Sequence, residues 1–156
     1  MAEIGVGDLP GATAARFADD DAAQLAIDTA LVAARRYTGW HVSPVREADE
    51  LVLDGSGSRI LQLPTRKLLD VTEVTENTVD LDTAKLVWSP TGAVRKKSDA
   101  YWSCAYQSIA VTIDHGYTEE EAADWRQAIL LMVDDISTAS TSAEEAGRLV
   151  RKRVDD

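Results

Sequence analysis

Residues 109–121 have the sequence IAVTIDHGYTEEE, a strand pattern that continues directly into a helix-capping pattern. The isoleucines and the valine of this stretch alternate with smaller or polar residues, so they share one face of a strand. Gly116 interrupts the alternation, and Thr118 stands three residues before Glu121, which is the spacing of a capping box. The stretch therefore predicts a half-buried strand, a corner at Gly116 and a long helix that begins at Thr118.

Apolar residues at helical spacing follow this stretch, and a second such pattern lies near the start of the chain. We expect the earlier helix from about Asp21 to Thr38, because the aspartates from Asp19 onward suit the positive end of a helix and Gly39 can stop it. The buried stripe of the later helix comprises Trp125, Ile129, Met132, Val133 and Ile136. The matching stripes predict that the two long helices pack on each other.

The segment between the two helices, about residues 49–114, has strand and turn patterns instead. Leu51 and Leu53 alternate with polar residues, a Gly-Ser turn follows at 54–57, and a second alternating run precedes Pro64. Two alternating runs joined by such a turn predict a β-hairpin.

A second hairpin is expected from residues 86–89 and 93–95, which a Pro-Thr-Gly turn joins. Between the hairpins, residues 71–75 are rich in β-branched side chains, but the two valines of this run fall on opposite faces and leave its register open. The chain is therefore expected to be an α+β protein, with a small antiparallel sheet or partial barrel inserted between two long helices.

The ends of the chain are expected to be arms. Residues 1–18 contain glycines and a proline before a possible turn or two of helix. The small hydroxylated residues at 137–142 compete with a helical backbone and predict a hinge. We therefore expect a single α+β domain over residues 1–142, with an N-terminal arm, and a C-terminal arm over 143–156. A second capping box could make the C-terminal arm helical from about Ala143 on contact with a partner.

The charge and cysteine content limit the classes of partner and compartment. The chain has 16 Lys and Arg against 27 Asp and Glu, a formal net charge of -11, so a DNA duplex or an anionic membrane would be repelled. The single cysteine, Cys104, cannot form an intrachain disulfide, which suits a reducing compartment, and we expect it to be a small packed side chain. No stretch approaches the length of a membrane span.

A search for chemistry yields no catalytic, cofactor-binding or metal-binding residues. His41 and His115 lack other ligand types at metal-binding spacing, and no phosphate-binding glycine loop occurs. An Asp114–His115 pair could serve a hydrolytic site, but neighbours on a strand point to opposite faces. We therefore expect no enzyme and no cofactor.

Two short basic clusters stand out in an acidic chain. They are Arg66 with Lys67, and Arg95 with Lys96 and Lys97. Each is either solvated loop charge or a contact for an acidic or phosphate-bearing partner.

Four segments resemble, in order and spacing, the head-to-tail adaptor (head-tail connector) proteins of tailed bacteriophages. They are Tyr37–Trp40 at the end of a helix, Leu61–Pro64, Trp88–Arg95, and Val111–Tyr117 before the capped helix. The resemblance covers roughly residues 20–140.

The resemblance implies a structural virion protein and no enzyme. Such proteins form a ring, usually twelve-fold, in the phage neck; one side binds the capsid portal and the other binds a stopper or further tail protein. They are made in the host cytoplasm, and the acidic ring lumen would let DNA pass without sticking. The candidate portal contacts on the C-terminal arm are Arg148, Leu149, Val150, Arg151, Lys152 and Arg153, and the candidate loop contacts are the two basic clusters.

Three other functions remain open from the sequence. The chain could be another neck ring protein, such as a stopper or a tail terminator. It could be a small acidic regulator that mimics nucleic acid and binds a basic partner. An enzyme with an unrecognised site would need a convergent cleft of polar residues.

Overall fold

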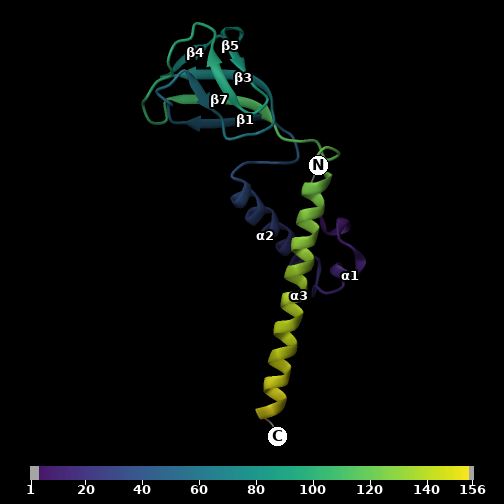
Figure 1. Cartoon of the computed structure of the whole chain (residues 1–156). Helices are drawn as coiled ribbons and strands as arrows, with labels where there is room; N and C mark the ends of the chain where they lie inside the picture. Colours follow the sequence, from purple (N-terminus) through teal and green to yellow (C-terminus); the bar gives the residue numbers. More distant parts are fainter. Residues whose placement is uncertain (1–3, 155–156) are drawn as a thin grey trace. The chain divides into compact units, whose positions relative to one another are not determined.

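The computed structural model describes residues 4–154, with side chains for residues 4–139. The chain divides into two compact units (Figure 1). The helical unit contains the residues up to Thr38 and those from Ala123 onward, and the β unit contains Gly39–Ala122. The expected class, helices together with small antiparallel sheets, is confirmed.

The helical unit is built on α2 (Asp20–Thr38) and α3 (Ala123–Val154), with the short η1 (Val6–Asp8) and α1 (Gly11–Ala14) before them. α2 begins where the sequence predicts, because Asp19 Oδ1 accepts the backbone N–H of Ala22 at 2.8 Å. Residues from both long helices and the N-terminal segment share one apolar core: Ile4, Leu9, Ala23, Ala26, Ile27, Ala30, Leu31, Ile129 and Val133. No helix in the described part of the chain combines the length and apolar character needed to cross a membrane.

α3 differs from its predicted limits at both ends. The Thr118 capping box forms, since the N–H of Glu121 donates to Thr118 Oγ1 at 3.2 Å and the N–H of Thr118 donates to Glu121 Oε2 at 3.1 Å. It closes a turn, however, and the helix itself begins at Ala123.

The hinge expected at 137–142 is wrong, because α3 continues to Val154. The hydroxyls of Ser137 and Thr138 both donate to the carbonyl of Asp134, at 2.7 and 3.0 Å. Bonded to the preceding turn in this way, they do not compete with the helical backbone.

The β unit contains two antiparallel sheets around one core. Sheet A has the strand order β1 (Arg46–Leu53), β7 (Ile109–His115), β3 (Leu68–Glu76), β4 (Val79–Leu81). Sheet B has the order β2 (Ile60–Gln62), β6 (Ala93–Lys96), β5 (Leu86–Trp88), and η2 (Thr83–Lys85) links β4 to β5. Both sheets contribute to the buried cluster of Leu61, Leu63, Leu68, Val71, Val74, Leu86, Val94, Trp102, Ile109, Val111 and Ile113.

The first predicted hairpin is wrong, because its two strands belong to different sheets. β1 pairs with β7 and β2 pairs with β6. The turn between them is held by another loop instead: the N–H groups of Gly55 and Gly57 donate to Ala105 O and Ser103 O, both at 2.9 Å. A Cβ on Gly55 would lie 2.1 Å from Ser103 O, so only glycine lets the two loops approach this closely.

The other strand predictions are confirmed, and the open register is resolved. β5 and β6 form the expected hairpin, with Gly92 at a φ of +86° in its turn. In β3, a register shift between Val71 and Glu73 adds one residue to the strand, so that Val71 and Val74 both face the core.

Candidate functional site

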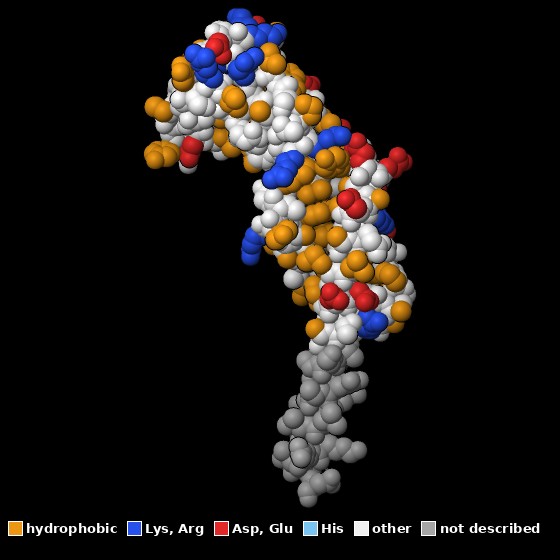
Figure 2. Space-filling view, in the orientation of Figure 1, with side chains coloured by type: hydrophobic (Ala, Val, Ile, Leu, Met, Phe, Trp, Pro, Cys, Tyr) orange, Lys and Arg blue, Asp and Glu red, His pale blue; other side chains and the backbone are white. Residues whose placement is uncertain are grey.

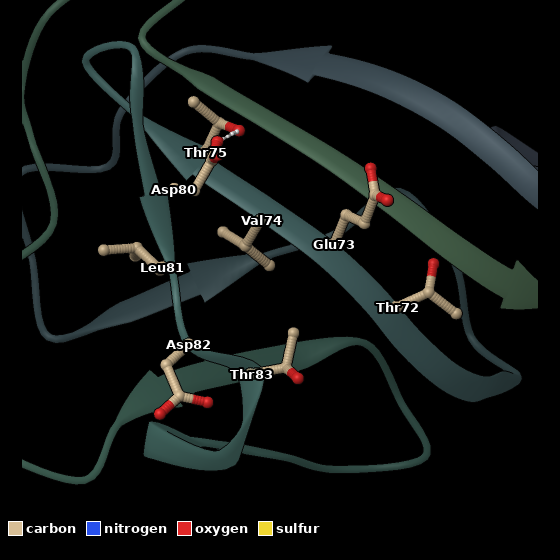
Figure 3. Close-up of a pocket in the computed structure, with 8 residues that line it drawn as sticks. All are labelled: Thr72, Glu73, Val74, Thr75, Asp80, Leu81, Asp82 and Thr83. Carbon is tan, nitrogen blue, oxygen red and sulfur yellow. Dashed lines mark hydrogen bonds between the residues drawn. The ribbon is translucent and has the colours of Figure 1, made fainter.

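A hollow of about 380 Å³ lies beside β3 and β4, and its lining combines threonines with carboxylates (Figure 3). The lining residues are Thr72, Glu73, Val74, Thr75, Asp80, Leu81, Asp82 and Thr83. The Thr75 hydroxyl donates to Asp80 Oδ1 at 2.9 Å across the two strands, while Asp82 Oδ1 accepts the N–H of Ala84 at 3.0 Å and caps η2.

The chemistry of this hollow is that of an anionic surface. Its three carboxylates have no histidine, cysteine or lysine beside them in the lining, and Thr75 is the residue whose hydroxyl donates to one of them, Asp80. The described residues contain no group of three or more His, Cys, Asp or Glu that could hold a metal ion. Such a surface suits cationic side chains and opposes polyanions.

A second hollow of about 290 Å³ lies next to the first and shares Asp80, Leu81 and Asp82 with it. Its other lining residues are Lys85, Leu86, Lys96, Lys97 and Ser98. The lining thus changes from acidic to basic across β4. Figure 2 shows Lys and Arg side chains gathered over the end of the β unit where Figure 1 places β5.

In the two basic clusters predicted from the sequence, some side chains bind other residues of the β unit and others form no ion pair with a described residue. Lys67 Nζ binds Glu121 at 2.8 Å and lies 4.9 Å from the ring centre of Tyr117. Hydrogen bonding to Lys67 is the main cause that lowers the pKa of the Glu121 carboxyl.

Lys96 is also engaged within the β unit. Its Nζ pairs with Glu76 at 2.5 Å and lies 4.6 Å from the ring centre of Trp102. Lys97 donates to Ala84 O at 2.7 Å, although its side chain is exposed. Arg66 and Arg95 are exposed and form no ion pair with a described residue. These two arginines are therefore the loop candidates with an available charge.

His115 lies in a buried polar network. His115 Nε2 lies 3.0 Å from Asp49 Oδ2, and His115 Nδ1 lies 3.2 Å from Thr65 Oγ1. Asp49 and not Asp114 is therefore the acid beside His115. His115 and Thr65 are only 2% and 3% exposed, so a substrate could not reach the hydroxyl without rearrangement. The arrangement stabilises the fold by satisfying buried polar groups.

Cys104 is exposed, which corrects the expectation of a packed side chain. It lies on the loop that bonds to Gly55 and Gly57, and this loop occupies the surface of the β unit.

The predicted portal contacts lie outside the described side chains. The backbone of α3 carries residues 148–153 as a continuous helix, but nothing is described of their side chains. No family model matches the chain, and no curated protein matches it.

Sequence reasoning missed the difference in charge between the two sheets. The strands of sheet A carry eight carboxylates and one arginine, whereas the strands of sheet B carry two cations and no carboxylate. The alternation of Glu50 with Leu51 already places carboxylates on one face of β1. The wrongly predicted hairpin, however, paired this strand with β2 and so with the less acidic sheet.

Proposed function

We propose that this chain is a non-enzymatic virion protein of a tailed bacteriophage. It forms a homo-oligomeric ring in the neck, joins the capsid portal to the stopper or the next tail protein, and surrounds the DNA passage. The packed pair of α2 and α3 supplies the rigid part of each subunit, and the β unit supplies surfaces for neighbours.

The main support for the proposal is a contact between two of the four segments that resemble the adaptor proteins, Tyr37–Trp40 and Val111–Tyr117. The ring of Trp40, just after α2, contacts Tyr117 edge-on with centroids 5.9 Å apart. The N–H of Tyr117 also donates to Val42 O at 2.8 Å. Segments separated by more than 70 residues in the chain thus fasten the entry and exit of the β unit to each other.

The charge of the molecule is compatible with a DNA passage. Each copy carries a formal charge of -11, so a ring would repel the sliding polyanion instead of binding it. The basic end of α3, including Arg148, Arg151 and Lys152, is the proposed portal contact, with salt-sensitive binding.

Electron microscopy of tailed particles tests the proposal by locating the chain relative to the portal. We expect several copies in one layer directly below the portal. Density in the next layer would identify a stopper or tail terminator instead. A monomer that is absent from particles and binds a basic enzyme would support the nucleic-acid mimic and refute the neck role.

A truncation after Ser142 tests the portal contact itself. It leaves every described core residue of the helical unit in place, so we expect a folded protein that no longer attaches to portal-bearing heads. The matched control, Arg36→Ala, removes an exposed cation of α2 that belongs to none of the candidate contacts, and it should attach normally. Normal occupancy of the truncated protein would refute the C-terminal contact.

A further inference from the structure

The two sheets of the β unit present outer faces of opposite character. Both sheets bury their inner side chains in the same core, so their outer faces point away from each other. Each copy of the chain therefore displays one acidic face and one basic, partly apolar face on a single folded unit.

The acidic face has a row of three residues across sheet A. Thr112 of β7 pairs with Glu50 of β1 on one side and with Glu73 of β3 on the other. Directly opposed residues of an antiparallel sheet lie on the same face, so two carboxylates flank one threonine. Both glutamates are exposed and form no ion pair with a described residue.

An apolar patch adjoins this row. Val52 is 65% exposed and pairs with Ala110, which is also exposed. Because Val52 is two residues from Glu50 in β1, it lies on the same face.

The basic face has a matching row across sheet B. Arg95 of β6 pairs with Ile60 of β2 and with Val87 of β5. Ile60 and Val87 are 53% and 44% exposed, and Arg95 forms no ion pair with a described residue. A free guanidinium therefore stands between two exposed aliphatic side chains.

We propose that these faces bind each other between copies of the chain, with Arg95 of one copy placed between Glu50 and Glu73 of the next. With the strands of sheet B crossing those of sheet A, Val87, beside Arg95, then lies over the patch of Val52 and Ala110. Each copy binds one neighbour through its acidic face and another neighbour through its basic face, so the contact is head-to-tail and can repeat around a ring. This inference rests on the proposed ring function and names the surfaces that build it.

Charge complementarity favours a second copy over other occupants. The acidic row offers two exposed carboxylates, and the basic row offers one exposed guanidinium, none of them in an ion pair with a described residue. Nucleic acid could approach only the basic face, and it would do so against the net charge of -11.

Chemical crosslinking tests the juxtaposition in the full chain with the charged rows intact. In a Cys104→Ser background, Val87→Cys and Val52→Cys copies are mixed and treated with a short bismaleimide. We expect dimers in the mixture and none with either variant alone, because each contact joins unlike faces. Equal crosslinking of Val87→Cys alone, or no crosslinking at the highest soluble concentration, would overturn the proposal.

Charge reversal gives an independent test by sedimentation velocity. We expect Arg95→Glu to weaken self-association about tenfold or more, and the double variant Glu50→Lys with Glu73→Lys to do the same. Mixing the two variants should restore association, because every alternating contact is again complementary. Arg36→Glu makes the same charge change in α2, outside both faces, and should associate as the unmodified chain does.

The outcomes separate this interface from the neck function. An Arg95→Glu protein that associates normally and still forms a neck layer refutes the interface and leaves the function standing. Restored association in the mixture, with the chain absent from particles, supports the interface and refutes the neck role.

Discussion

Trp40 and Tyr117 meet with their ring planes at 63°, although one follows α2 and the other follows β7. The backbone on both sides of this contact is tightly joined. Gly116 has a φ of +108°, and its N–H donates to Lys67 O at 2.9 Å. The corner that the sequence places at this glycine is therefore also the point where the β unit closes.

Gly116→Ala is expected to destabilise the β unit. An added Cβ would lie 2.9 Å from Pro44 O, and the positive φ is unfavourable for alanine, so we expect a loss of about 1–3 kcal/mol. Chemical denaturation measures this. Gly7→Ala is the control, because nothing lies within 4 Å of its added Cβ, and equal stability of the two variants would refute the explanation.

Thr65→Val tests the buried network around His115. The substitution keeps the side-chain shape but removes the hydroxyl that lies near His115 Nδ1 and accepts the N–H of Lys67 at 3.2 Å. We therefore expect the free energy of unfolding to fall by about 1–3 kcal/mol. The exposed Thr72→Val removes a 3.1 Å hydrogen bond to Thr112 O and should change stability by no more than about 0.5 kcal/mol. A Thr65 variant as stable as the Thr72 variant would show that the network contributes little.

Ile129→Ala is expected to weaken the helical unit. Ile129 is fully buried between α2 and α3, and shortening it leaves a cavity that costs about 2–5 kcal/mol. Leu131, two residues along the same helix, is 57% exposed, so Leu131→Ala should have little effect. Thermal unfolding of both variants compares them, and similar losses would contradict the assigned helix faces.

Asp134 links folding of the helical unit to pH. The Thr13 hydroxyl, which donates to Asp134 Oδ1 at 2.6 Å, and the nearby Arg16 hold the pKa of this carboxyl below its usual value of 3.8. A lowered pKa in the folded state means that the stabilisation is present above pH 3.8 and is lost as the pH falls through the folded value.

Thr13→Val should raise the pKa of Asp134, because it removes the hydrogen bond from the Thr13 hydroxyl, which lowers this pKa most. NMR titration of the Asp134 carboxyl measures this. Asp134→Asn is expected to reduce the acid sensitivity of unfolding, since no proton can then be taken up at this position. An unchanged carboxyl titration in the Thr13 variant would exclude the hydroxyl as the cause.

Local patterns in the sequence predict the elements of this protein well. The limits of α2 follow from the Asp19 cap and from Gly39, and β7 follows from simple alternation, because each depends on contacts within a few residues. The hairpin of β5 and β6 is equally local, since its turn chemistry lies in the sequence between the strands.

What depends on distant residues was decided only by the tertiary structure. The partners of β1 and β2 depend on how Gly55 and Gly57 bond to the loop at 103–105, and the faces of β3 depend on a bulge against β7. The row of Glu50, Thr112 and Glu73 comes from three strands scattered along the chain. Sequence alternation assigns each side chain to one of two faces, but strand pairing alone brings those faces together, because backbone hydrogen bonds fix which residues stand opposite each other.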